Sequence, residues 1–271
     1  MPNPAIVALT IAGSDSSGGA GIQADLKTFS ALGVYGASVI TALTAQNTQG
    51  VRAIHDVPAD FIIAQIDAVF SDLEVNAVKI GMLSQTATIE AVAKGLDRHR
   101  AMNIVLDPVM IATSGDRLLA ADAVAAVRAW LIPRALVVTP NLPEAAALLE
   151  HAPAHSEAEM EEQARALLGL GAQSVLIKGG HGEGAESVDL LIDATSVTRF
   201  AAMRVATRNT HGSGCTLSSA IAAGLAKGLD LKAAARDAKA YVTAAIASAD
   251  VLRIGHGHGP LHHFHELWRK L

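Results

Sequence analysis

The sequence predicts an α/β fold in which helices cover both faces of a mainly parallel sheet. Apolar runs alternate with segments of helical period along the whole chain. The apolar runs are almost continuous in Val, Ile and Leu, which is typical of strands buried on both faces. Hydrophobic residues make up 51% of the chain and aromatic residues only 3%, so small aliphatic side chains must build the core. Such side chains suit close packing of helices on a sheet.

The apolar runs are the expected strands, and the segments between them are the expected helices. The strands are expected at residues 6–12, 34–43, 77–80, 104–106, 135–138, 175–177 and 188–192. The helices include residues 21–32, 60–70, 86–98, 121–130 and 157–168. Gly33 follows the first helix and Pro58 precedes the second, and both are typical boundary residues. Right-handed crossovers through such helices give parallel strands.

Domain organisation is expected to be simple. The chain has no tract typical of a linker, no long charged block and no repeat of fixed period, so residues 1–271 are expected to form one domain. The least regular segments, at residues 108–117, 151–156 and 181–186, are expected to be loops. In a sheet of this kind, functional side chains gather at the carboxyl ends of the strands.

Charge and cysteine content exclude several classes of protein. The chain carries 21 Lys and Arg against 26 Asp and Glu, a formal net charge of −5. Proteins that bind nucleic acid normally show a basic excess or stripe, so no nucleic-acid partner is expected. The single cysteine, Cys215, excludes an intramolecular disulfide and fits a reducing compartment.

No membrane segment or signal peptide is expected. The longest stretch without Lys, Arg, Asp or Glu covers residues 28–51, but it contains Gly33, Gly36 and a polar run beginning at Gln46. A spanning helix needs about 20 predominantly apolar residues, which this stretch does not offer. The N-terminus also lacks the basic region of a signal peptide. We therefore expect a cytoplasmic protein without a membrane partner.

A Gly-Ser-Gly turn before an apolar helix is the most informative segment. Gly212, Ser213 and Gly214 precede Cys215 and an apolar period that continues through Leu217. Such a turn leaves backbone N–H groups unobstructed, and the helix dipole adds partial positive charge, so the turn suits a phosphate or a developing anion. Cys215 would lie in the first helical turn, where the pKa of a thiol is commonly depressed. The alternative is that Cys215 is a small, inert core residue.

A second glycine-rich segment, residues 13–21, joins the first expected strand to the first helix. It lacks the Gly-Lys-Ser/Thr ending of a P-loop and the G-x-G-x-x-G spacing of a dinucleotide site. Glycines here would let the backbone approach a ligand, with Asp15 and Asp25 as available polar groups. The alternative is a flexible turn with a serine N-cap.

Acidic and amide side chains follow two neighbouring strands. Asp107 ends the strand at residues 104–106, and Asn141 and Glu144 follow the strand at residues 135–138. Oxygen ligands at the same sheet edge suit Mg²⁺, which tends to take one or two carboxylates together with phosphates and waters. A helix cap is the other interpretation of Asn141 and Glu144. Lys178 ends a further strand and could meet phosphates, although a solvated lysine is the ordinary alternative.

Taken in order, these segments resemble the hydroxymethylpyrimidine/phosphomethylpyrimidine kinases of thiamine biosynthesis. The resemblance covers essentially the whole chain, and its joint motifs are far more specific than any one of them. The motifs are residues 11–28 (IAGSDSSGGAGIQADLKT), 44–48 (TAQNT), 79–83 (KIGML), 107–110 (DPVM), 141–145 (NLPEA), 178–181 (KGGH), 209–217 (NTHGSGCTL) and 259–265 (GPLHHFH). The resemblance implies a three-layer, ribokinase-like fold.

The resemblance also implies a reaction and a substrate site. The family uses ATP and Mg²⁺ to phosphorylate 4-amino-5-hydroxymethyl-2-methylpyrimidine to its monophosphate and then to the diphosphate. By motif, Gln46 would hydrogen-bond the aminopyrimidine, because its amide offers both a donor and an acceptor. Asp25 would lie near the hydroxymethyl arm, Met82 and Val109 would line the ring pocket, and Gly13 would adjoin the substrate.

The remaining motifs correspond to the nucleotide and metal site of the family. Asp107, Asn141 and Glu144 would organise Mg²⁺ and the triphosphate, partly through water, and Lys178 would contact ATP. Residues 212–214 would form the anion hole. The family also suggests a homodimer. Nothing in the sequence shows which loop closes over the substrate, and residues 108–117 are chosen only for their Gly and Ser content.

Cys215 is where this chain departs from the sugar kinases of the superfamily, which carry an aspartate base at that position. A thiolate could take the proton of the attacking hydroxyl, while positioning and electrostatics supply most of the acceleration. Ser213 replaces a threonine found in many relatives, which is a conservative change.

Three questions stay open at this level. A pyridoxine or pyridoxal kinase is the closest rival, because its substrate is also a heteroaromatic with a hydroxymethyl arm; Gln46 and residues 13–15 favour the pyrimidine. A non-catalytic sensor of a vitamin precursor is the rival from another class, and it would have no need of the transfer residues. The spacing of the closing histidines permits a metal site, but the resemblance favours a tail typical of the family. These histidines are His256, His258, His262, His263 and His265.

Overall fold

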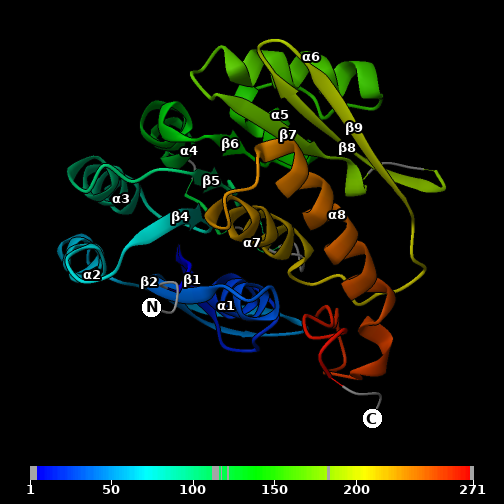
Figure 1. Ribbon diagram of the computed structural model, residues 1–271, viewed down its shortest axis with the longest axis horizontal. Helices are drawn as coiled ribbons and strands as arrows, with labels where there is room; N and C mark the ends of the chain where they lie inside the picture. Colours follow the sequence, from blue (N-terminus) through cyan, green and yellow to red (C-terminus); the bar gives the residue numbers. More distant parts are fainter. Residues whose placement is uncertain (1–4, 112–115, 117, 121, 182–183, 269–271) are drawn as a thin grey trace.

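The computed structural model contains one nine-stranded sheet with helices on both faces (Figure 1). The structure describes residues 5–111, 116, 118–120, 122–181 and 184–268. The strands are β1 (Val7–Asp15), β2 (Tyr35–Asn47), β3 (Gly50–Asp56), β4 (Val75–Ile80), β5 (Ile104–Leu106), β6 (Val137–Val138), β7 (Ser174–Lys178), β8 (Glu186–Asp193) and β9 (Val197–Met203). Their order in the sheet is β3-β2-β1-β4-β5-β6-β7-β8-β9.

Parallel pairing runs from β2 to β7, as predicted, and antiparallel strands close both edges. β3 pairs with β2 at one edge, and β8 and β9 extend the other. All the strands expected from the apolar runs are present. β3 and β9 were not predicted, because they are edge strands without an apolar run, and the side chains of β9 alternate between exposed and half-buried. The α/β fold with a mainly parallel sheet is confirmed.

The helices form two layers. On one face lie α2 (Ala59–Phe70), α3 (Thr86–Arg98), α4 (Ala123–Ala126), α5 (Leu142–Leu149) and α6 (Glu157–Leu168). On the other lie α1 (Gly21–Ala31), α7 (Ser213–Ala226) and α8 (Leu231–Ala247). Short helical turns occupy η1 (Val127–Leu131), η2 (Ile132–Arg134), η3 (Gly179–His181) and η4 (Ala249–Val251). These two layers and the sheet give the predicted three-layer arrangement.

Successive side chains of the central strands pack into two hydrophobic cores, one on each face of the sheet. In β5, Ile104 and Leu106 pack against the layer of α2 to α6, whereas Val105 packs against the layer of α1, α7 and α8. In β7, Ile177 packs against the layer of α2 to α6 and Leu176 against the layer of α1, α7 and α8. Successive side chains of a strand point to opposite faces, so a strand covered on both faces must be apolar throughout. This explains why the strands read as continuous apolar runs.

Several element boundaries differ from the sequence-based expectation. β1 continues past Ala12 to Asp15 because it keeps pairing with β2 after an irregularity at residues 12–14. The helix expected at residues 121–130 is divided: α4 passes into the wider turn η1, and Pro133 follows in η2. Residue 121 lies outside the described residues. A proline has no N–H to continue a helix, so the helical segment ends there.

The predicted loops have different outcomes. Residues 151–156 form a loop, as expected. In the segment 181–186, Glu186 already begins β8, and residues 182–183 lie outside the described residues. In the segment 108–117, residues 112–115 and 117 lie outside them as well, so the proposed closing loop stays a prediction. Across the described parts of the chain, no helix is long and apolar enough to cross a membrane.

Candidate active site

A pocket of about 670 Å³ lies where the carboxyl ends of the parallel strands meet the N-terminus of α7. All the site residues predicted from the sequence line this pocket except Asp25. The predicted residues found in the lining are Gly13, Gln46, Met82, Asp107, Val109, Asn141, Glu144, Lys178, Gly212, Ser213, Gly214 and Cys215. They come from both halves of the chain, and the fold brings them to one crevice. Their individual roles remain predictions.

The first turn of α7 forms an anion-binding turn, which we define as residues 212–215. Gly212 is the N-cap and has a φ of 82°, and a Cβ placed on it would lie 1.9 Å from the carbonyl oxygen of Gly19. Only glycine fits this position. The Ser213 N–H donates to the carbonyl of Thr210 at 3.1 Å. Helix geometry leaves the N–H groups of Gly214 and Cys215 without intrahelical partners, and both residues face the pocket. The turn is therefore suited to a phosphate.

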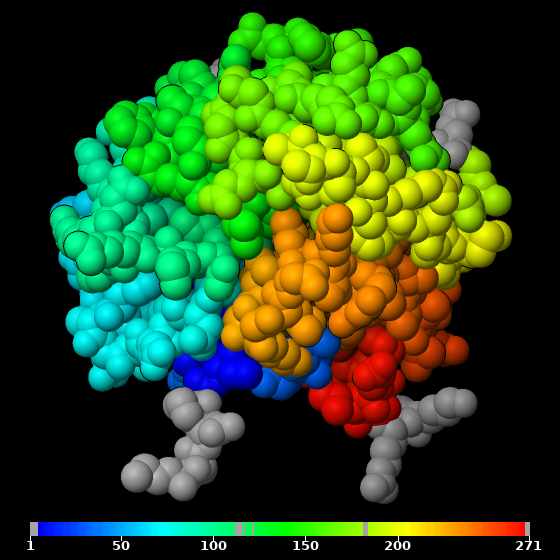
Figure 2. Space-filling model, turned by 45° about the horizontal axis from the view of Figure 1, so that its top comes forward, coloured from blue at the N-terminus to red at the C-terminus, as the bar shows by residue number. Residues whose placement is uncertain are grey.

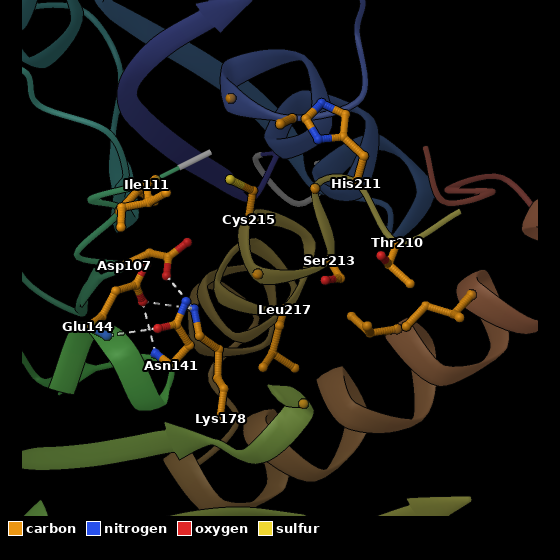
Figure 3. Close-up of a pocket in the computed structure, with 18 of the residues that line it drawn as sticks. Asp107, Ile111, Asn141, Glu144, Lys178, Thr210, His211, Ser213, Cys215 and Leu217 are labelled. Carbon is orange, nitrogen blue, oxygen red and sulfur yellow. Dashed lines mark hydrogen bonds and ion pairs between the residues drawn. The ribbon is translucent and has the colours of Figure 1, made fainter. Parts of the chain in front are cut away.

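Cys215 is half-buried and lies at the pocket, close to the Gly21 backbone N–H (Figure 3). The alternative that it is an inert core residue does not fit this position. Burial raises the pKa of the Cys215 thiol to about 11, and the neighbouring Lys79 ammonium only partly offsets the effect of burial. The sequence-based expectation of a depressed pKa is therefore wrong. Loss of hydration outweighs the helix terminus and the nearby cation here, so the thiol is neutral at pH 7.

Two carboxylates share a lysine beside the anion-binding turn; we call Asp107, Glu144 and Lys178 the carboxylate–lysine cluster (Figure 3). Lys178 Nζ lies 2.7 Å from Asp107 Oδ1 and 3.8 Å from Glu144 Oε2. The Lys178 side chain is only 11% exposed, so the alternative of a solvated strand-end lysine is wrong. Burial raises the pKa of Glu144 to about 7; Lys178 opposes this rise and the Asp107 charge adds to it. Asp107 stays ionised: burial would raise its pKa, but Lys178 lowers it below the usual value.

Asn141 and Glu144 also cap α5. Asn141 Oδ1 accepts a hydrogen bond from the Glu144 backbone N–H at 2.8 Å, and Glu144 Oε2 accepts one from the Asn141 N–H at 2.8 Å. This reciprocal pair is a capping box, so the helix-cap interpretation is confirmed. Because the cap holds both side chains at the edge of the pocket, it also fits a site that binds a cation.

Gly13, Gln46 and Met82, which are predicted to contact the substrate, line the pocket together. A Cβ on Gly13 would lie 2.6 Å from the sulfur of Met82, so the two residues are in close contact. Gln46 is held by its neighbours: its side-chain Oε1 accepts a hydrogen bond from Thr44 Oγ1 at 3.0 Å, and its backbone N–H and carbonyl both bond the Ser16 hydroxyl. These bonds orient the Gln46 amide toward the pocket.

Asp25 does not line the pocket, and its place near the hydroxymethyl arm stays a prediction. Its carboxylate is fully buried and accepts hydrogen bonds from Thr10 Oγ1 at 2.6 Å and Ser219 Oγ at 2.6 Å. It also pairs with Lys79 Nζ at 2.9 Å. Ser219 follows Cys215 by one helical turn, on the same face of α7. Asp25 therefore supports the floor of the site beneath Cys215.

Sequence reasoning missed two buried polar pairs of this site. Lys79 is fully buried; burial would lower its pKa, but Asp25 raises it above the usual value, so Lys79 stays charged. A lysine inside the apolar run of β4 was the signal that could have found it. The second pair joins His211 Nε2 to Asp15 Oδ2 at 2.9 Å. Asp15 also accepts the Gly19 and Ala20 N–H groups, so the pair ties the loop at residues 13–21 to the anion-binding turn.

The closing histidines do not gather around a common point. No group of three or more His, Cys, Asp or Glu side chains that could hold a metal is found in the part of the chain that the structure describes. The His262 ring packs edge-on against Trp268, and His263 Nε2 lies 3.0 Å from Thr216 Oγ1. The predicted magnesium site is of a different kind, because Mg²⁺ takes phosphates and waters besides one or two carboxylates.

Comparisons with known proteins give a consistent picture. The family described as phosphomethylpyrimidine kinase matches residues 15–262. A hydroxymethylpyrimidine/phosphomethylpyrimidine kinase of Rhizobium meliloti (strain 1021) is 62% identical over 97% of this chain and 98% of its own length. A solved phosphomethylpyrimidine kinase of Clostridium difficile 630 is 46% identical, with a TM-score of 0.79 over 89% of this chain and 99% of the other. A pyridoxal kinase of Staphylococcus aureus, solved with AMP-PCP and pyridoxal, is 33% identical, with a TM-score of 0.90 over 98% and 96%.

The raised pKa of Cys215 predicts slow and strongly pH-dependent alkylation. Only the thiolate reacts, so the rate of reaction with iodoacetamide should rise about tenfold per pH unit from pH 7 to 10. Cys215 is the only cysteine, so the total label reports on it alone. The matched control is the same chain in guanidinium chloride, where the thiol should titrate near the ordinary value of about 8.5. A plateau below pH 9 in the folded protein would contradict the neutral thiol.

Proposed function

The chain belongs to the phosphomethylpyrimidine kinase family, and on this premise we propose how its pocket carries out the reaction. The chain is a phosphotransferase of thiamine biosynthesis. It uses ATP to phosphorylate 4-amino-5-hydroxymethyl-2-methylpyrimidine to the monophosphate and then to the diphosphate. One observation carries the assignment of residues: Cys215, the anion-binding turn, the carboxylate–lysine cluster and Gln46 all line one pocket.

The pyrimidine binds at the end of the pocket lined by Gln46 and Met82. A ring nitrogen beside an exocyclic amino group offers an acceptor next to a donor, and a carboxamide matches both. The contact of 3.0 Å between Thr44 Oγ1 and the Gln46 side-chain amide supports this role, because it restrains the position of the amide. Met82 and Val109 line the same end and supply an apolar surface for the ring. Gly13 lets the backbone approach closely, since any Cβ there would meet Met82.

The carboxylates of the carboxylate–lysine cluster would hold Mg²⁺, and the phosphates of ATP bind between this cluster and the anion-binding turn. The fit is supported by Lys178, whose ammonium already lies between the Asp107 and Glu144 carboxylates, so these two carboxylates are arranged to share a cation. Asn141 would act through its place beside Glu144. A bound Mg²⁺ supplies neutralisation of phosphate charge. Lys178 meets the phosphates as a point charge, and the N–H groups of the anion-binding turn stabilise the transferred phosphoryl group.

Cys215 takes the proton of the hydroxymethyl group. A bond forms between the substrate oxygen and the γ-phosphorus, the bond from that phosphorus to the bridging oxygen of ADP breaks, and the hydroxyl proton moves to the sulfur. Phosphoryl transfer passes through a loose transition state, so the base is needed late, and positioning and electrostatics supply most of the acceleration. Because the resting thiol is neutral, the active species is its minor thiolate form. In the second reaction the acceptor is an anionic phosphate oxygen, so no such base is needed.

Pyridoxal is the second candidate substrate, because a pyridoxal kinase solved with pyridoxal has a TM-score of 0.90 with this chain. Turnover of both compounds by one preparation gives the order of preference. A failure to form ADP with any hydroxymethyl heterocycle would favour a sensor instead. We also propose that residues 1–271 act as one domain in a cytoplasmic homodimer; these three points rest on the sequence and on the family alone.

Replacing Cys215 should separate the two phosphorylations. Cys215→Ala removes the base, so the kcat for the alcohol should fall by about 10²-fold or more, the usual contribution of general base catalysis. The kcat for the monophosphate should fall less than about tenfold, because its acceptor oxygen is already ionised. The two reactions are measured separately by ADP release. Equal losses in both would contradict the role of Cys215 as a base.

Filling the anion-binding turn should harm activity without unfolding the protein. A Cβ at Gly214 would lie 3.1 Å from Lys178 Nζ and 3.9 Å from Asp107 Oδ2, within the space assigned to the phosphates. Gly214→Ala should therefore lower kcat/KM for ATP by about tenfold to a hundredfold, a typical effect of misplacing a reacting group. Its Tm should stay level or rise, since alanine is the better helix former. Full activity in this variant would show that the phosphates bind elsewhere.

A further inference from the structure

The C-terminal segment, which we define as residues 259–263, packs against the start of α7. Figure 2 shows the end of the chain, in red, against the N-terminal part of the protein, in blue, and Figure 1 places it beside α1 and the end of α8. Pro260 forms a parallel bridge with His211, whose backbone N–H donates to the Gly259 carbonyl at 3.1 Å. The Gly259 N–H donates in turn to Asn209 Oδ1 at 3.0 Å. The segment thus runs beside residues 209–211, directly before the anion-binding turn.

One side chain of this segment reaches the turn itself. His263 is 4% exposed, and its Nε2 lies 3.0 Å from Thr216 Oγ1. Thr216 Oγ1 also lies 2.8 Å from the carbonyl oxygen of Gly212. A carbonyl can only accept and a hydroxyl has one proton, so both contacts are made when Thr216 donates to Gly212 and His263 donates through Nε2–H. This forms a chain of hydrogen bonds from His263 to the N-cap of α7.

The neutral form of His263 suits this chain of bonds. Burial, together with a smaller effect of the Lys27 ammonium, lowers the pKa of His263 to about 3. The neutral ring carries one N–H; with the proton on Nε2, it donates to the Thr216 hydroxyl and Nδ1 is left as an acceptor. On the other side of the residue, the His263 carbonyl accepts a hydrogen bond from Tyr241 Oη at 2.7 Å. His263 is thus held between α8 and α7 and has little freedom to turn away.

We infer that the C-terminal segment positions the anion-binding turn, and that His263 is the positioning residue, acting through Thr216 on the carbonyl of Gly212. The peptide plane of Gly212 and Ser213 is rigid, so holding its carbonyl sets the entry of the chain into α7. That entry sets the direction of the Gly214 and Cys215 N–H groups. The inference rests on the proposed function of this turn as the phosphate site. It assigns the buried histidine a role in positioning rather than in metal binding or proton transfer.

His262 offers a matched control for His263. The two histidines are adjacent and similarly buried, at 8% and 4% exposure. The His262 ring packs against Trp268 at a centroid distance of 5.2 Å. Replacing either residue by alanine removes buried volume from the same segment, so both variants should lose stability. Only His263→Ala also removes the bond that fixes the Thr216 hydroxyl, so that Thr216 bonds the Gly212 carbonyl without support from the C-terminal segment.

The test is a double-mutant cycle between His263 and Thr216. His263→Ala and the nearly isosteric Thr216→Val should each lower kcat for the aminopyrimidine about tenfold, because the donors of the phosphate site shift in direction. The KM for the aminopyrimidine should change less than about twofold, since its end of the pocket is untouched. The double variant should be no slower than either single variant, because both remove one chain of bonds. His263→Gln, whose amide N–H can replace Nε2–H, should recover most of the rate.

The controls separate positioning from general destabilisation. His262→Ala should lower Tm by an amount similar to His263→Ala while keeping kcat within twofold of the wild type. The inference is overturned if His263→Ala keeps the wild-type kcat, if His262→Ala loses as much, or if the losses multiply in the double variant. If the wild type does not phosphorylate the aminopyrimidine, the proposed function fails. The inference is then tested by the affinity for AMP-PCP. His263→Ala should weaken this affinity about fivefold, whereas His262→Ala should leave it unchanged.

Discussion

The close approach of Gly212 to Gly19 is the contact on which the site depends. A Cβ on Gly212 would lie 1.9 Å from the Gly19 carbonyl oxygen, so a side chain at this position would push the two loops apart. The contact joins the loop after β1 to the start of α7, segments separated by almost 200 residues in the chain. The pair formed by Asp15 and His211, 2.9 Å apart, closes the same junction. Because of this contact, the sulfur of Cys215 and the anion-binding turn face the pocket that the strand ends enclose.

Buried charge in this site is balanced by pairs rather than by solvent. Lys79 pairs with Asp25 beneath Cys215, and Lys178 pairs with Asp107 within the carboxylate–lysine cluster. A buried pair of this kind costs desolvation free energy and contributes little net stability, whereas removing one partner is strongly destabilising. Such pairs therefore fit a functional role better than a stabilising one. Burial leaves the Cys215 thiol neutral in the resting protein, because the Lys79 ammonium only partly offsets the effect of burial on its pKa.

Much of this site could be predicted from the sequence, because its residues sit at positions that topology defines. Asp107, Glu144 and Lys178 follow strands of a parallel sheet, so they had to meet at one edge. The quantities that depend on burial could not be predicted. Cys215 lies in the first turn of α7, which favours a low pKa, but burial of the thiol raises its pKa instead. Asp25 lies on a predicted helix, yet only the packing of α1 against α7 shows that it faces the floor rather than the pocket.

The edge strands and the contacts of the closing histidines could not be predicted from the sequence for a different reason. β3 and β9 bury little apolar surface, so their sequences carry no strand period that stands out from a loop. The histidines near the C-terminus are numerous enough to suggest a metal site. In the structure, however, His262 packs against Trp268 and His263 contacts the Thr216 hydroxyl. Only tertiary structure distinguishes these uses of the same residue type.

A crystal structure with the aminopyrimidine and AMP-PCP bound together tests the account most directly. The account predicts the ring beside the Gln46 amide, the hydroxymethyl oxygen within roughly 3–3.5 Å of the terminal phosphorus, and the Cys215 sulfur in contact with that oxygen. The terminal phosphate should lie on the N–H groups of Gly214 and Cys215. A hydroxymethyl arm turned away from the sulfur, or a terminal phosphate bound away from α7, would contradict it.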